Sequence, residues 1–189
     1  MKVYFVIINI ISFILYCINM ILNKFKYNRD TNILLIIISF FGGSIGIIFA
    51  ILLFDRTISK NNIMFRIFII CMFIIELLIF IIFKNNCGEK INFAIWELFC
   101  KYKTSLVYLC LINIITFIVF TLDKINAILG HWRFKIVTLL SLCFIGGTIG
   151  GLLSMYMFKH KTNVNYFTWG IPIIITMHIV TMIFLINVI

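Results

Sequence analysis

The sequence predicts an all-α integral membrane protein, with six transmembrane helices that form two three-helix repeats of inverted orientation. Three observations lead to this fold class: the composition, six long apolar segments, and an internal repeat with an offset of 104 residues. Continuous apolar segments favour helices over the strands of a barrel, because barrel strands alternate between apolar and polar residues.

The composition excludes several classes of protein. Of the 189 residues, 63% are hydrophobic and only 12% are charged, and the mean hydropathy is +1.18. A soluble domain is about half apolar and about a quarter charged. Water-soluble enzymes, secreted disulfide scaffolds and nucleic-acid-binding modules all need polar surface that this chain lacks. The formal charge of +10 lies in short clusters between apolar segments, so no nucleic acid is expected as a partner.

Six segments are long enough to cross a membrane, which takes about 20 mostly apolar residues. In chain order they are Val3–Asn23, Ile33–Phe54, Ile67–Phe83, Thr104–Leu122, Ile136–Phe158 and Thr168–Ile189. The third is the shortest and contains Glu76. Trp96, Trp132 and Trp169 lie at or just outside the ends of segments. Aromatic side chains prefer this depth at the membrane–water interface.

The repeat divides the chain into a first unit of residues 1–83, an interfacial linker of residues 84–103 and a second unit of residues 104–189. The shift of 104 residues aligns Asn9 with Asn113, Arg29 with Arg133, and one group of glycines with another. These glycines are Gly42, Gly43 and Gly46 in the first unit, and Gly146, Gly147 and Gly150 in the second. Three crossings per unit would place the second unit upside down relative to the first, as in many secondary transporters.

An alternative fold of the same residues stays open. If Gly42-Gly43 and Gly146-Gly147 break their helices, each of these two segments becomes a re-entrant hairpin. Each unit then crosses the membrane twice, the units have parallel orientation, and both polar loops of a unit lie on one side.

Motifs in the second half resemble those of a known family. In chain order they are Asp123-Lys124, Ala127, Trp132-Arg133, Gly146-Gly147-x-x-Gly150, Phe158-x-His160-Lys161-Thr162 and Gly170-x-Pro172. This order resembles the small membrane family called Domain of Unknown Function 1294, from about Leu109 to the C-terminus. The chain departs from the family pattern at Lys135-Ile136, where a Pro-Glu pair is usual. The resemblance implies a fold and no assigned activity.

The first half resembles the same family more faintly and has lost part of the motif. Asn19 and Met20 stand in place of the Asp-Lys pair, and Asp55-Arg56-Thr57 stands in place of the Lys-His-Lys run. If the motif performs chemistry, the second half performs it and the first half is its structural partner.

A polar stripe and the glycines each have two interpretations. Spacings of three, four and three residues place Asn113, Thr116, Phe120 and Asp123 on one helical face. Asn9, Ser12, Tyr16 and Asn19 repeat this stripe in the first half. The stripe either joins helices by hydrogen bonds or lines a wet path for a substrate. The glycines either let two helices pack closely or leave bare backbone for a ligand.

Basic residues gather at two places in the second half, with Lys124, Arg133 and Lys135 at one and Lys159, His160 and Lys161 at the other. Such residues bind anionic lipid headgroups. Together with Asp123 and Thr162 they can also hold a phosphate or move a proton. With six straight spans the two places are about 34 Å apart, at 1.5 Å per residue. With re-entrant hairpins the two places are able to form one site.

Glu76 and His178 each lie near the middle of a span. Ionisable groups at that depth are costly and are functional candidates by default. A pair of the two would make a proton relay, although the repeat aligns Glu76 with Val180 rather than with His178.

The sequence favours a small transporter or lipid-headgroup carrier with its pathway at the repeat interface. The alternatives are a membrane-embedded enzyme that acts on a phospholipid or polyprenyl phosphate, and a non-catalytic subunit of a membrane complex. No nucleotide loop or metal-ligand set is visible, so no cofactor or metal is expected. Membrane lipids, a second copy of the chain or another membrane protein are the expected partners, in the cytoplasmic membrane of a bacterium.

Overall fold

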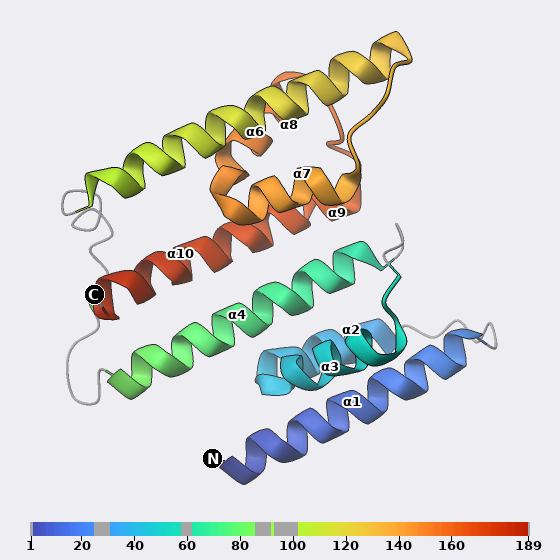
Figure 1. The fold of residues 1–189 in the computed structure, drawn as a ribbon. Coiled ribbons are helices and arrows are strands. Elements are labelled where there is room, and N and C mark those ends of the chain that lie inside the picture. Colours follow the sequence, from blue (N-terminus) through green and yellow to red (C-terminus); the bar gives the residue numbers. More distant parts are fainter. Residues whose placement is uncertain (1, 25–30, 58–61, 86–91, 93–101, 189) are drawn as a thin grey trace. The chain divides into compact units, whose positions relative to one another are not determined.

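The computed structural model describes residues 2–24, 31–57, 62–85, 92 and 102–188, and all secondary structure in these ranges is helical (Figure 1). The first half contains α1 (Lys2–Lys24), α2 (Thr31–Ile38), η1 (Ser39–Gly43), α3 (Ser44–Phe54) and α4 (Ile63–Asn85). The second half contains α6 (Lys103–Leu129), α7 (Ile136–Leu142), η2 (Cys143–Gly147), α8 (Thr148–Met157), α9 (Asn165–Thr168) and α10 (Gly170–Val188).

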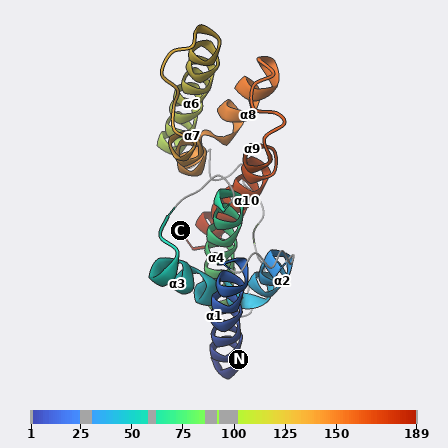
Figure 2. The same ribbon diagram turned by 90° about the vertical axis from the view of Figure 1, so that its right-hand side faces the viewer.

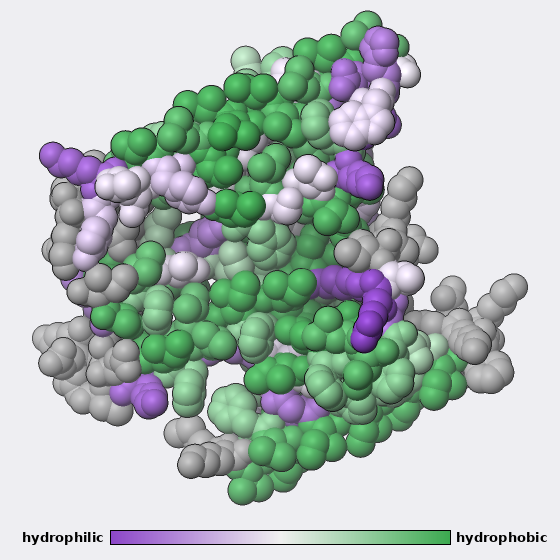
Figure 3. Space-filling model, viewed as in Figure 1, coloured by the Kyte–Doolittle hydropathy of each residue, from purple (hydrophilic) through white to green (hydrophobic). Residues whose placement is uncertain are grey.

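The all-α fold class is confirmed. Six segments are long and apolar enough to cross a membrane, with bounds close to the predicted ones. The largest difference is at α6, which continues to Leu129 and therefore carries Asp123 and Lys124 on the helix. Figure 3 shows apolar side chains over most of the visible helix surfaces, with hydrophilic residues gathered near the helix ends.

The chain forms two compact units, Met1–Phe80 and Ile81–Ile189, and each is described here by itself. Most of the interfacial linker predicted for residues 84–103 lies outside the described residues.

In the second unit, the segment Ile136–Phe158 is a helical hairpin and not a straight helix. It breaks at Gly146, whose φ of 130° lies outside the helical region. Beyond the break, α8 runs beside α6 in the same chain direction. Gly150 N–H bonds to Asn113 Oδ1 at 2.8 Å, and farther along both helices Ser154 Oγ lies 3.2 Å from Thr121 Oγ1. Both ends of the hairpin therefore lie at the same end of α6 (Figure 1).

The first unit has the same reversal at Gly42, with a φ of 99°. Gly46 N–H bonds to Asn9 Oδ1 at 2.8 Å, and Asp55 at the end of α3 accepts a hydrogen bond from Tyr16 at 3.1 Å. As the chain continues from Gly46 to Asp55, its contacts on α1 advance from Asn9 to Tyr16. Figure 2 shows α2 and α3 as separate helices on either side of α1.

The prediction that Ile33–Phe54 and Ile136–Phe158 are single continuous helices is therefore wrong, because both segments are hairpins that break at a glycine. The physical reason is the glycine at each break, because a positive φ is readily adopted only by glycine. The re-entrant path of these hairpins through a membrane stays a prediction. At about 1.5 Å per residue, arms of about ten residues span about 15 Å, which is half of a hydrocarbon core of about 30 Å. The separation of 34 Å between the two basic places, which assumed a straight helix, is wrong for the same reason.

Side chains of the neighbouring helices bond the carbonyl groups that each break leaves without a helical partner. In the first unit, Tyr4 bonds Phe41 O, Asn9 bonds Gly42 O and Ser12 bonds Gly43 O, at 2.8–3.0 Å. In the second unit, Tyr108 bonds Ile145 O at 2.8 Å and Asn113 bonds Gly146 O at 3.1 Å. Hydrocarbon cannot form hydrogen bonds with the free carbonyl groups of a broken helix. These side chains provide the missing partners.

Candidate functional site

The reversal of the α7–α8 hairpin brings three segments of the second unit together. The last turns of α6 provide Asp123, the turn after α8 provides His160 and Lys161, and the segment before α7 provides Phe134. We call the side chains of Asp123, His160 and Lys161 the Asp123 cluster. The sequence predicted two separate basic places for a straight helix, and the structure joins them.

Asp123 is fully buried and both of its carboxylate oxygens are bonded. Oδ1 accepts a hydrogen bond from the backbone N–H of Phe134 at 3.0 Å. Oδ2 lies 2.9 Å from His160 Nε2 and 2.6 Å from Lys161 Nζ. A buried carboxylate is costly unless it is paired and hydrogen-bonded, and here three groups from two loops satisfy it.

The turn that carries the two basic residues has an unusual backbone. Lys159 and Lys161 have φ values of 45° and 62°. These values lie in the left-handed region, which residues other than glycine and asparagine rarely adopt. Such strain persists only where the surrounding contacts enforce it. Lys161 Nζ is held by Asp123 and also lies 4.9 Å from the centre of the Phe167 ring. These contacts account for the conformation of Lys161.

Burial sets the ionisation of the two basic members of the cluster. The pKa of His160 is lowered from its usual value, first by burial and then by the charges of Lys161 and Lys124, although its hydrogen bond to Asp123 opposes this shift. Burial also lowers the pKa of Lys161, against its bond to Asp123. Because the lowered pKa of His160 favours the neutral ring at neutral pH, Lys161 is the member that balances the charge of Asp123.

The residues around the cluster include cations that are not paired with Asp123, and aromatic rings. Lys124 is partly buried, and Arg133, Lys135 and Lys159 are exposed. Trp132, Trp169 and Tyr156 are each more than 60% exposed on the neighbouring segments. Exposed tryptophan and tyrosine side chains mark the headgroup depth of a bilayer, so this end of the unit has the composition of a membrane interface.

The other candidates in the second unit make hydrogen bonds within the fold. Asn113 bridges the hairpin, because its amide bonds Gly146 O and Gly150 N–H. Thr116 is buried and donates to Ile112 O within α6. The carbonyl of Thr162 accepts a hydrogen bond from Thr168 at 2.7 Å. Of these contacts, those of Asn113 join α6 to the hairpin, whereas the bond of Thr116 lies within α6 and that of Thr162 links the turn after α8 to α9.

The glycines allow close packing of the first helix of each unit on its hairpin. An added Cβ at Gly46 would overlap Asn9 O, and one at Gly150 would overlap Asn113 O. Gly147 leaves room for Thr116, and Gly43 leaves room for the side chains of Ile38 and Ser12. Protein atoms therefore occupy the space that a ligand would need at these glycines.

Glu76 and His178 each contact the hairpin of their own unit. Ser44 Oγ donates to Glu76 Oε2, whereas Glu76 Oε1 is buried without a hydrogen-bond partner in the described part of the chain. His178 Nε2 lies 2.9 Å from Phe144 O, next to the break at Gly146. The proton relay between the two residues stays a prediction.

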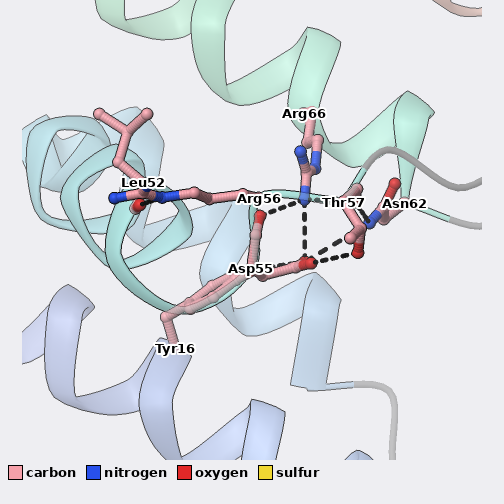
Figure 4. A network of polar contacts seen from close by, with 7 residues as sticks. All are labelled: Tyr16, Leu52, Asp55, Arg56, Thr57, Asn62 and Arg66. Atoms are coloured by element: carbon pink, nitrogen blue, oxygen red, sulfur yellow. Dashed lines mark hydrogen bonds and ion pairs between the residues drawn. The ribbon is translucent and has the colours of Figure 1, made fainter.

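At the corresponding end of the first unit, the structure shows an ion pair that the sequence analysis missed (Figure 4). Arg66 Nη2 lies 3.0 Å from Asp55 Oδ2, to which Tyr16 also donates at 3.1 Å. Here the carboxylate follows the hairpin and the cation is on α4, whereas in the Asp123 cluster the carboxylate is on α6 and the basic side chains follow the hairpin. The side chain of Asp55 is 26% exposed. The signal in the sequence was that Asp55 aligns with the basic residue Lys159.

No group of three or more His, Cys, Asp or Glu side chains in the described ranges could hold a metal ion.

Comparisons with known proteins select the same region. The family model described as "Protein of unknown function (DUF1294)" matches residues 113–167, a range that contains the hairpin and the whole Asp123 cluster. The uncharacterized protein YsdA of Bacillus subtilis (strain 168) is 35% identical over 68 residues, which are 36% of this chain and 76% of that protein. No solved structure matches the chain. The chain therefore belongs to the DUF1294 family of proteins of unknown function.

Proposed function

We propose that this protein is a multi-pass membrane protein whose second unit binds the headgroup of an anionic lipid at the end of α6. The single observation that carries the proposal is the ion-paired contact of Asp123 with His160 and Lys161, which joins the two basic places. Asp123 is the one carboxylate within residues 102–188, and five cations belong to the same segments, Lys124, Arg133, Lys135, Lys159 and Lys161. The excess positive charge favours a negatively charged ligand.

The arrangement in the membrane follows from the hairpins. In each unit the first and last helices cross the bilayer, and the hairpin enters and leaves on one side. The prediction of inverted repeats depended on three crossings per unit and stays a prediction. The exposed tryptophans near the Asp123 cluster support a position at headgroup depth. The similarity to a protein of Bacillus subtilis supports the cytoplasmic membrane of a bacterium as its location. The predicted transport pathway between the repeats stays a prediction.

Neutralising two of the cations tests the headgroup site. We expect Lys124→Gln combined with Arg133→Gln to weaken the binding of phosphatidylglycerol about 30-fold at low salt, because each basic residue near a headgroup contributes about 1 kcal/mol. Binding is measured by titration of the lipid into the purified protein in a nonionic detergent. At higher salt concentration we expect a smaller difference in lipid affinity between the variant and the wild type, because salt screens the charges.

Lys103→Gln is the matched control, because Lys103 is an exposed cation at the opposite end of α6. We expect this variant to bind the lipid as the wild type does. If both variants lost the same affinity for the lipid, the net charge of the protein, and not the Asp123 end of α6, would attract the lipid. The proposal would then be wrong.

A further inference from the structure

The imidazole ring of His160 has one nitrogen engaged and one available. Nε2 lies 2.9 Å from Asp123 Oδ2, and because a carboxylate accepts hydrogen bonds, Nε2 carries the hydrogen. In the neutral ring the other nitrogen, Nδ1, then holds a lone pair. Nδ1 receives no hydrogen bond from any residue in the described ranges. One tenth of the side chain is exposed.

Charged groups of every neighbouring segment act on this ring. On α6, Asp123 bonds it and Lys124 repels its protonated form, and in the same turn Lys161 also repels that form. Arg133, on the segment before α7, acts on Lys161 in turn. Together with burial these groups lower the pKa of His160, so the ring is ready to accept a proton once a strong negative charge arrives next to Nδ1.

We infer that the site takes a phosphomonoester headgroup, and that His160 Nδ1 accepts one proton from solvent as this headgroup binds. The inference rests on the proposed headgroup site and names its ligand class. No covalent bond other than the new N–H changes. The proton comes from the solution, and the resulting imidazolium donates it as a hydrogen bond to a phosphate oxygen.

The charge of the ligand distinguishes a monoester from a diester. A phosphomonoester carries about −1.5 to −2 charges at neutral pH, whereas a diester such as phosphatidylglycerol carries one. An opposite charge within about 4–6 Å favours the charged form of a titrating group, and the monoester provides more of that charge. The cations around the cluster can compensate a dianion and still leave the protonated His160 stabilised.

The direction of the pH dependence follows from this linkage. Free His160 has a lowered pKa and binding raises it, so the complex holds more protons than the free protein between the two values. Affinity for a monoester therefore increases as the pH falls between these two values. The increase ends near a pH of about 6, where the phosphate takes up its own second proton.

The test compares phosphatidate, phosphatidylglycerol and phosphatidylcholine, each titrated by calorimetry into the full-length protein in nonionic detergent. His160→Gln is the key variant, because its amide can still donate to Asp123 and has no titrating nitrogen. For the wild type we expect the dissociation constant for phosphatidate to fall about threefold or more for each unit by which the pH is lowered. Uptake of one proton limits this change to about tenfold per unit. For His160→Gln we expect a smaller pH dependence and less proton uptake, measured in two buffers of different ionisation enthalpy.

The outcomes separate this inference from the proposed function. Equal affinity for phosphatidate and phosphatidylglycerol, or an unchanged pH dependence in His160→Gln, would overturn the inference and leave the headgroup site in place. No preference for either anionic lipid over phosphatidylcholine would overturn both. Competition by inorganic phosphate distinguishes the source of the ligand. Displacement of phosphatidate by the free ion, with the same dependence on His160, indicates a site for the phosphate group alone, whereas resistance to it indicates a lipid.

Discussion

Asp123→Asn is expected to lower the free energy of unfolding by about 3 kcal/mol, the largest effect we expect from a change of a single charge. The asparagine keeps the size of the side chain and its bond to Phe134 N–H, but it leaves the ammonium group of Lys161 buried without a counter-ion. Removing one partner of a buried ion pair costs about 3–5 kcal/mol. Unfolding in mixed detergent micelles, followed by circular dichroism, measures the change.

A double-mutant cycle gives this prediction its control. Adding Lys161→Met to Asp123→Asn is expected to restore most of the lost stability, because the uncompensated charge is then gone. Lys159→Gln, on the same turn and exposed, is expected to change stability by less than about 0.5 kcal/mol. If Asp123→Asn were as harmless as Lys159→Gln, the ion pair would not hold the two loops together.

Gly150→Ala is expected to destabilise the second unit by about 3 kcal/mol, at the upper end of the usual cost of overpacking. The added methyl group would overlap the backbone carbonyl of Asn113, so α8 has to move away from α6. That movement breaks the bond from Gly150 N–H to Asn113 Oδ1 and displaces the turn that carries His160. We therefore expect weaker binding of anionic lipid together with the loss of stability.

Gly130→Ala is the matched control for this substitution. Gly130 has a φ of 69°, but no atom lies within 4 Å of an added Cβ. An alanine there bears only the cost of the left-handed conformation, about 1 kcal/mol. If the two substitutions destabilised the protein equally, the close contact between α6 and α8 would not be needed for the fold.

The sequence predicted which segments are helical better than it predicted the course of the chain within the two glycine-containing segments. Composition and segment length were enough for the all-α class and for six segments of membrane-crossing length. Hydropathy cannot show that Gly42 and Gly146 adopt positive φ values, because a glycine pair inside an apolar segment fits a packed straight helix equally well. The hydrogen bonds of Asn9 and Asn113 recur with the same offset of 104 residues, which supports the predicted duplication.

The candidate site depended on this path. Asp123, His160 and Lys161 were selected from the motif, but their contact requires the hairpin to return along α6. Phe134 contributes only a backbone N–H, and the role of Phe167 is a ring face beneath Lys161. A backbone N–H and a ring face are not marked by any sequence motif, so neither contribution could be predicted. The pairing of Asp55 with Arg66 was missed because Arg66 aligns with Gly170, so the motif of the second half has no charge at that position.

The central claim is that the two loops flanking the α7–α8 hairpin lie on one side of the membrane. Single cysteines at His131 and Asn163, both exposed, test it in a variant without the six native cysteines. A third cysteine at Lys103 marks the other end of α6. With an impermeant thiol reagent on intact cells and inside-out vesicles, we predict that positions 131 and 163 react from the same side and position 103 from the opposite side. Reaction of 131 and 163 from opposite sides would show a straight crossing helix, and it would contradict both the hairpin and the joined Asp123 cluster.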